Sequence, residues 1–230
     1  MRKSRSSRII AGLSLLLIAA GAVSLGSGFG PFPLLARFDF ENGRADGWRP
    51  RDPAHWRVAG TGGNRFYELT AAGEAGKVRA PTSWSLLEGH EVSSFEFSGR
   101  FQCDTDPSNN KRDMCVFFGY QDPVHFYYVH FAGSSDDVHN IIGLVNGADR
   151  VKINLEPAGG SVFRMIDKAW HTFKVTEDAA TGDIRAFLDD MEKPILTARD
   201  RTLTHGLVGL GSFDDTGRFD DIELRGILFK

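Results

Sequence analysis

Several polar and aromatic side chains in the middle of the chain could together recognise a sugar. An aromatic ring can lie against the C–H face of a pyranose, while guanidinium, imidazole, amide and carboxylate groups bond to its hydroxyls. We therefore predict a ligand-binding surface made of Glu96, Arg100, Tyr120, Tyr128, His130, His139 and Asn140. The alternative is that these are ordinary core or surface residues.

The same residues do not decide whether the protein is an enzyme. Glycoside hydrolysis needs two carboxyl groups, about 5–5.5 Å apart in retaining enzymes and about 6.5–9.5 Å apart in inverting ones. Glu96 is the one carboxylate in the predicted surface, and the sequence has no Glu-x-Asp-x-Glu motif. A polysaccharide lyase needs a cation for a uronate and a Tyr or His for proton transfer. Arg100, Tyr128 and His130 match those types, and no catalytic residue is assigned.

Acidic residues gather near the first and last segments of the chain that we predict to be strands. Calcium takes six to eight oxygen ligands, many of them carboxylates. Asp39, Glu41 and Asp221 are therefore candidate ligands for a structural calcium ion. The alternative is that aspartates in turns only bond to their own backbone. No other cofactor is predicted.

The first 25 residues have the charge and hydropathy pattern of a secretory signal. Four basic residues precede the apolar run Ile9–Leu25, and Ala22-Val23-Ser24 offers a small-x-small cleavage site. An uncleaved membrane anchor is the alternative, because the run is near the lower length limit for a bilayer span. We expect a secreted, periplasmic or cell-surface protein that touches a membrane only through this segment.

Export has two consequences for the rest of the chain. An oxidising compartment favours a disulfide between the two cysteines, Cys103 and Cys115, which would stabilise the fold by roughly 3 kcal/mol. Removing residues 1–24 takes four of the 27 basic residues and none of the 30 acidic ones, which leaves a net charge near −7. Such a charge disfavours nucleic acid and other polyanionic partners.

The elements that must position these residues are strands. After a Gly/Pro linker at 26–33, apolar and polar residues alternate with a period of two, as in Phe95–Gln102. Asn146-Gly147 predicts a hairpin turn, and helix is limited to single turns at Ala71–Gly76 or Ser83–Glu88. Predicted strands cover Phe38–Glu41, Phe95–Gln102, Val116–Tyr120, Val124–Phe131, Ile141–Val145, Trp170–Thr176, Ile184–Leu188, Pro194–Ala198, Leu207–Phe213 and Phe219–Leu228.

This pattern predicts a single all-β domain over residues 34–230. Many short strands with turn signals and no long helix favour a two-sheet antiparallel β-sandwich. The first and last strands both carry Phe-Asp sequences, and we expect them to lie side by side.

Several of these segments resemble the concanavalin A-like lectin/glucanase sandwiches, in particular the laminin-G-like and 3-keto-disaccharide hydrolase-like domains of exported bacterial proteins. The matching segments are Phe38–Gly43 with Gly47-Trp48, Trp170–Val175, Ile184–Asp190, Gly206–Gly211 and Phe219–Ile222. The resemblance covers most of the chain after the linker and implies a concanavalin A-like jelly roll. It also implies that the concave sheet face carries the predicted surface.

The resemblance implies carbohydrate as the ligand class, and three functions stay open. The first is binding of an oligo- or polysaccharide on the concave face. The second is a glycoside-processing enzyme, of the 3-keto-glycoside hydrolase type or, with less support, a polysaccharide lyase. The third is a cell-surface module that contacts another protein. Core strands and turns indicate the fold and do not decide among these functions.

Overall fold

The computed structural model describes residues 32–60, 63–155 and 163–230. Within them it contains 16 strands and one short 3-10 helix, Pro53–His55, arranged as two antiparallel sheets. The predicted all-β sandwich is thus confirmed. The predicted signal segment at 1–25 and most of the linker at 26–33 lie outside the described residues.

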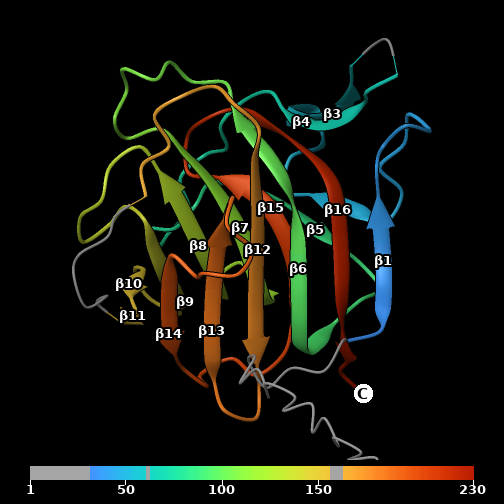
Figure 1. The fold of residues 1–230 in the computed structure, drawn as a ribbon. Coiled ribbons are helices and arrows are strands. Elements are labelled where there is room, and N and C mark those ends of the chain that lie inside the picture. The colour runs from blue at the N-terminus through green and yellow to red at the C-terminus, as the bar shows by residue number, and fades with distance from the viewer. Residues whose placement is uncertain (1–31, 61–62, 156–162) are drawn as a thin grey trace, which may run out of the picture. The chain divides into compact units, whose positions relative to one another are not determined.

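The larger sheet has nine strands in the order β11-β14-β13-β12-β6-β16-β4-β3, with β1 also paired to β16 (Figure 1). Its two longest members, β6 and β16, lie side by side in the middle of the order. Its strands are β1 (Leu34–Phe38), β3 (Trp56–Ala59), β4 (Phe66–Leu69), β6 (Val92–Cys103), β11 (Asn154–Leu155), β12 (His171–Asp178), β13 (Asp183–Leu188), β14 (Leu196–Arg199) and β16 (Gly217–Leu228).

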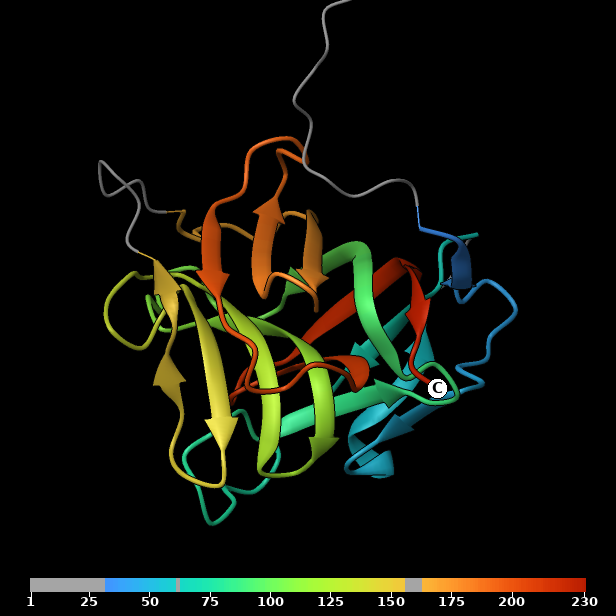
Figure 2. The same cartoon turned by 90° about the horizontal axis from the view of Figure 1, so that it is seen from below.

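The smaller sheet has seven strands in the order β10-β9-β8-β7-β15-β5-β2. Figure 2 shows the two sheets as separate layers, with the yellow and yellow-green strands β9 and β8 in the lower one. Its strands are β2 (Trp48–Pro50), β5 (Ser83–Leu87), β7 (Asp113–Asp122), β8 (His125–Ala132), β9 (Ile141–Asn146), β10 (Val151–Lys152) and β15 (Leu207–Ser212).

The main hydrophobic core lies between the two sheets. Phe95, Phe97 and Phe101 face it from β6, and Met114, Val116 and Phe118 face it from β7. Because successive side chains on a strand point to opposite faces, the residues between them point away from the core. Cys115 and Phe117 of β7 belong to a second apolar cluster on the outer face of the seven-stranded sheet.

Two predicted pairings are confirmed. β1 pairs antiparallel with β16 in a register that places Phe38 opposite Ile222, so the first and last strands are neighbours. The predicted turn at Asn146-Gly147 is also found: β9 ends at Asn146, Gly147 has a positive φ of 73°, and the chain turns back to pair as β10.

Two local predictions are wrong. Residues 83–88 do not form a helical turn, since Ser83–Leu87 is the extended strand β5. The predicted strand Phe38–Glu41 ends at Phe38, because Phe40 turns into the left-handed region at φ 53° and accepts a bond from the Gly43 N–H at 2.9 Å. The turn places the Phe40 ring in the core.

Within the described residues, no helix is both long enough and apolar enough to cross a membrane.

Candidate functional site

The outer face of the seven-stranded sheet carries a continuous aromatic layer. Trp84 of β5, Tyr120 of β7 and Phe126 of β8 contact one another, with ring centroids 5.7–6.4 Å apart. Phe117 and Tyr128 extend the layer toward β9. A layer of this size needs a cover, because large apolar rings on an open sheet face would be exposed to water.

The cover is the irregular segment between β4 and β5. We call residues 73–82 the covering segment. Its Val78 and Ala80 pack on the aromatic layer. Its backbone is held by Asp149, whose Oδ1 accepts from the Arg79 N–H at 2.8 Å, and by the Arg51 guanidinium, which donates to the Thr82 carbonyl at 2.7 Å. The segment therefore seals part of the sheet face and leaves cavities along its sides.

One of these cavities, which we call the Tyr120 cavity, lies between the covering segment and the β7–β8 turn. Its volume is about 470 Å³, within the range of small-ligand sites. Trp84 and Tyr120 form its aromatic part, and three cations lie around it: Arg49, Arg51 and Lys77. A second cavity of about 500 Å³ lies on the other side of the segment, toward Asp149 and Phe213.

Charges around the Tyr120 cavity hold its aromatic floor in place. The Arg51 guanidinium stacks on the Trp84 ring, 4.7 Å from the centroid. Arg49 forms an ion pair with Glu88 at 2.5 Å. Burial raises the pKa of Tyr120 to about 12, although Arg49 and Arg51 act against that rise. The Tyr120 hydroxyl is therefore protonated at neutral pH and can both donate and accept a hydrogen bond.

Of the seven residues predicted to bind a ligand, Tyr120 lines this cavity. Tyr128 and His130 lie on the same face of the sheet, as the alternation along β8 predicted, but they are buried, with 0% and 3% exposure. The covering segment and Phe213 lie over this part of the sheet. Strand periodicity predicts which residues share a face, and it does not show what covers that face.

His139 and Asn140 are engaged by their own loop. His139 Nδ1 donates to the Asp136 carboxylate at 2.8 Å. The Asn140 Oδ1 accepts from the Ala132 N–H at 2.7 Å, and its Nδ2 donates to the carbonyls of Ser134 and Phe163. These bonds fold the loop after β8 onto the sheet, which indicates a structural role for Asn140.

Glu96 and Arg100 do not join this face, so the prediction of one surface for all seven residues is wrong. Both residues point outward from β6, a strand of the other sheet. The Arg100 guanidinium bonds to Asp220 at 2.6 Å and to Asp221 at 2.9 Å, and it stacks on Trp170. The error arises because the loop between β6 and β7 crosses from one sheet to the other instead of forming a hairpin.

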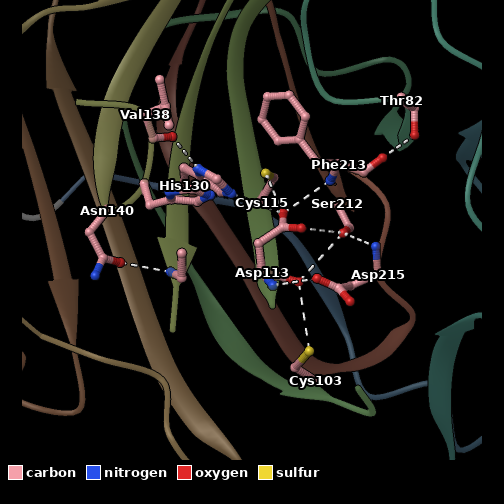
Figure 3. A network of polar contacts seen from close by, with 12 residues as sticks. Thr82, Cys103, Asp113, Cys115, His130, Val138, Asn140, Ser212, Phe213 and Asp215 are labelled. Atoms are coloured by element: carbon pink, nitrogen blue, oxygen red, sulfur yellow. Dashed lines mark hydrogen bonds and ion pairs between the residues drawn. The ribbon is translucent and has the colours of Figure 1, made fainter. Parts of the chain in front are cut away.

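A buried polar network lies at the start of β7, around its first residue Asp113 and next to the aromatic layer (Figure 3). The Asp113 carboxylate accepts from Ser212 Oγ and from the Phe213 N–H, both at 3.0 Å, and lies 3.3 Å from His130 Nε2. Burial would raise the pKa of Asp113, but the His130 ring and the Phe213 bond hold it below its usual value. Burial, together with the Asp113 charge, raises the pKa of the neighbouring Asp215 to about 6.

Cys103 and Cys115 are free thiols, and the predicted disulfide is not formed. Cys103 belongs to the core between the sheets, whereas Cys115 belongs to the outer aromatic layer. Figure 3 shows the two sulfur atoms on opposite sides of Asp113. A disulfide needs Cβ atoms that face each other, whereas Cys103 of β6 points into the core between the sheets and Cys115 of β7 points to the outer face.

The predicted calcium ligands have other partners. Asp221 pairs with Arg100, and Glu41 accepts from the Arg65 N–H at 2.7 Å. Asp39 accepts from the Glu41 N–H at 3.2 Å. In the described part of the chain, two groups of three side chains have the spacing of metal ligands, and both contain Asp113 instead. Calcium binding by Asp39, Glu41 and Asp221 stays a prediction.

The predicted site residues did not include Arg49, Arg51, Trp84 or the covering segment. A signal for Trp84 was present, since Trp84 and Leu86 alternate with Ser83 and Ser85 in the manner of a strand. Arg49 and Arg51 gave no comparable signal. Arg49 lies in the three-residue strand β2 at the sheet edge and Arg51 directly follows that strand, and only the fold brings them to Tyr120.

No family model matches the chain, and no curated protein matches it. Solved structures do match. A carbohydrate binding module, CBM66 from Bacillus subtilis, is 16% identical, with a TM-score of 0.53 over 78% of this chain and 96% of that one. The winged bean acidic lectin complexed with methyl-α-D-galactose is 13% identical, with a TM-score of 0.54 over 85% and 98%.

A GH16 protein of a mixed-linkage glucan locus from Bacteroides ovatus, in complex with a product, is also similar. It is 13% identical, with a TM-score of 0.55 over 82% of this chain and 99% of that one. Together with the two-sheet topology, these matches identify the fold as a concanavalin A-like jelly-roll sandwich. At sequence identities of 13–16%, these matches show a similar fold and nothing about function.

Proposed function

We propose that the protein binds carbohydrate in the Tyr120 cavity. The observation that carries this proposal is the composition of the cavity, which combines the aromatic rings of Trp84 and Tyr120 with the cations of Arg49, Arg51 and Lys77. The proposal is supported by the names of three structural neighbours: a carbohydrate binding module, a lectin and a GH16 protein in complex with a product.

The chemistry of the cavity suits a sugar ring. Trp84 and Tyr120 are each 6% exposed, and the parts of their rings that line the cavity offer apolar contact to C–H groups. The Tyr120 hydroxyl offers both a donor and an acceptor. Guanidinium groups donate in a fixed planar geometry that fits pairs of adjacent hydroxyls or a carboxylate. We therefore expect recognition of one or two sugar units, since the volume of about 470 Å³ is that of a small-molecule site.

Binding is favoured over glycoside hydrolysis. Hydrolysis needs a pair of carboxyl groups beside the scissile bond, and among the described residues that line the Tyr120 cavity there is no Asp or Glu. The finer resemblance to 3-keto-disaccharide hydrolase-like and laminin-G-like domains is compatible with either function.

Export is a separate proposal and is supported by the charge and hydropathy pattern of residues 1–25. The basic residues, the apolar run and the Ala22-Val23-Ser24 sequence predict entry into a secretory pathway. The measurement is cell fractionation followed by N-terminal sequencing of the mature protein. An intact N-terminus in the cytoplasmic fraction would overturn this proposal.

The binding proposal is tested with a glycan array, followed by calorimetry on the best ligand. Lys77→Ala removes an exposed cation of the cavity, and Tyr120→Phe removes one hydroxyl but keeps the ring. We expect each to weaken binding, roughly 3–30-fold for a lost polar contact. Lys111→Ala is the matched control, because Lys111 is exposed and lies outside the cavity.

Arg51→Ala and Arg57→Ala form a second matched pair. Arg51 lies beside the Tyr120 cavity, whereas Arg57 lies on β3 of the other sheet and pairs with Glu68. Sugar binding that is lost in Arg51→Ala and kept in Arg57→Ala supports the site. A glycan that binds equally to the wild type and to the three cavity variants, Lys77→Ala, Tyr120→Phe and Arg51→Ala, would place the site elsewhere. An array without any bound glycan would remove the function.

A further inference from the structure

Three side chains with metal-binding atoms converge at one end of the aromatic layer. Asp113 and Cys115 are two residues apart on β7 and therefore share a face, and His130 on β8 lies directly opposite Cys115 in the strand register. All three are buried, with exposure between 0% and 3%. Figure 3 shows the Cys115 sulfur, the His130 ring and the Asp113 carboxylate grouped together.

The distances between these atoms fit a shared ligand. The Asp113 Oδ2 lies 3.3 Å from Cys115 Sγ and 3.3 Å from His130 Nε2, and all three ligand atoms lie within 4.8 Å of one another. Ligand atoms on a tetrahedral zinc ion lie roughly 3.5 Å apart, as follows from bond lengths of about 2.0–2.3 Å. Only a small adjustment of side chains is needed to place an ion between them.

The hydrogen bonding of the His130 ring also points to a ligand at Nε2. His130 Nδ1 lies 2.9 Å from the Val138 carbonyl, and because a carbonyl only accepts, Nδ1 is the protonated nitrogen of this bond. The other nitrogen, Nε2, is buried and makes no hydrogen bond of good geometry, although the Asp113 carboxylate lies 3.3 Å away. A ring oriented through Nδ1–H to a backbone carbonyl is the usual arrangement of a histidine that binds a metal through Nε2.

Polar groups surround these three side chains and hold the Asp113 carboxylate in position. Ser212 Oγ donates to Asp113 Oδ1 and the Phe213 N–H donates to Oδ2, so the end of β15 fixes the carboxylate. The Tyr128 hydroxyl lies on the same face of β8, is buried and also lacks a hydrogen-bond partner. Two unpartnered polar groups beside one carboxylate and one thiol are unusual in a folded interior.

We propose that Asp113, Cys115 and His130 bind a divalent transition-metal ion, with zinc as the ion that best fits their oxygen, sulfur and nitrogen atoms. Calcium and magnesium prefer oxygen ligands alone. Binding replaces the hydrogen of the Cys115 thiol, which leaves as a proton to solvent, and joins β7 to β8 through the ion. The enclosed position gives the ion a structural role, separate from the Tyr120 cavity.

Cobalt(II) is the probe, added to the full chain purified without a metal-binding tag. We expect one equivalent to bind and to produce the near-ultraviolet charge-transfer band of a thiolate–cobalt bond. Cys115→Ser should lose this band, and Cys103→Ser should keep it, because Cys103 lies in the other core. His130→Gln should weaken cobalt binding at least roughly tenfold. Excess zinc should abolish the band.

Thermal unfolding of the wild-type chain tests the proposal even if Cys115→Ser does not fold. Zinc in excess of its dissociation constant should raise the Tm, since only the folded chain holds the three ligands together, and magnesium should leave the Tm unchanged. A wild-type chain without a thiolate–cobalt band and without a zinc-dependent shift in Tm would overturn the proposal. So would a band that persists in folded Cys115→Ser and disappears in Cys103→Ser.

Discussion

Cys103 and Cys115 both contact Asp113, but from opposite sides of strand β7. The Cys103 sulfur lies 3.8 Å from the Asp113 carbonyl on the inner side, and the Cys115 sulfur lies 3.3 Å from the Asp113 carboxylate on the outer side. The strand itself separates the two thiols, so they stay apart in an oxidising or a reducing compartment. Their free state therefore says nothing about export.

The first prediction concerns the thiols. Thiol titration in denaturant should find two free groups per chain, and the same reagent should react slowly with the native protein, because both sulfurs are buried. Mass spectrometry of unreduced peptides should recover Cys103 and Cys115 in separate peptides. A linked peptide would contradict the arrangement of β6 and β7.

The second prediction assigns Arg100 a role in stability. Arg100→Ala leaves the carboxylate of Asp220, which is 2% exposed, without its ion pair. Because the Arg100 side chain is itself 31% exposed, we expect a loss of about 1–3 kcal/mol in the free energy of unfolding by urea. Sugar binding should be unchanged. Arg57→Ala is the control: the Arg57 side chain is 66% exposed and its partner Glu68 keeps Arg218 nearby, so the loss should be less than about 1 kcal/mol.

The third prediction is a pH dependence caused by Glu177. Its side chain is 1% exposed, and burial, with the charges of Asp200 and Asp178 added, raises its pKa to about 8 from 4.5. Between these values the folded chain binds a proton that the unfolded chain has released. The free energy of unfolding should therefore fall as the pH rises from about 4.5 to 8, by roughly 2–5 kcal/mol from this group.

Urea unfolding at several pH values checks this effect. Glu177→Gln imitates the protonated carboxyl, so its stability should vary less with pH over the same range and should exceed that of the wild type at pH 8. Glu192→Gln, in an exposed turn, should follow the wild-type profile. Parallel profiles for all three proteins would show that Glu177 titrates normally.

The fourth prediction concerns the contact between Gly143 and Tyr128. The two residues are paired across β9 and β8, and a Cβ on Gly143 would lie 2.4 Å from the Tyr128 ring. Tyr128 is fully buried and has no room to move. We expect Gly143→Ala to lower the free energy of unfolding by about 1–3 kcal/mol.

Gly76→Ala serves as its control. The nearest atom to a new Cβ there is the Val78 carbonyl oxygen at 3.9 Å, which is an ordinary contact. Denaturant unfolding should show little change for this variant. Equal stability of the two variants would mean that the Tyr128 ring does not rest on Gly143.

Strand periodicity predicted much of the fold. The alternation in β8 correctly separates Phe126, Tyr128 and His130 from Tyr127, Val129 and Phe131, and the two sets lie on opposite faces of the seven-stranded sheet. The pairing of β1 with β16 was also predicted. These features follow from local chemistry, because a period of two determines the face of every residue in a strand.

The candidate site was less predictable, because it depends on contacts between distant segments. Arg49 and Tyr120 are far apart in sequence and meet only because β2 joins the sheet through β5 and β15. The covering segment has no regular structure and gives no periodic signal over most of its length. Glu96 was placed on the wrong sheet because consecutive strands are usually neighbours, whereas β6 and β7 are not.

The central position of β16 has a consequence for how the chain reaches its native state. Residues 217–228 supply neighbours for β1, β4 and β6, which precede them by more than a hundred residues. During synthesis these strands are made long before their shared partner exists, so their open edges stay available to other chains. Folding is therefore expected to be slow and to finish only after the last strand has left the ribosome.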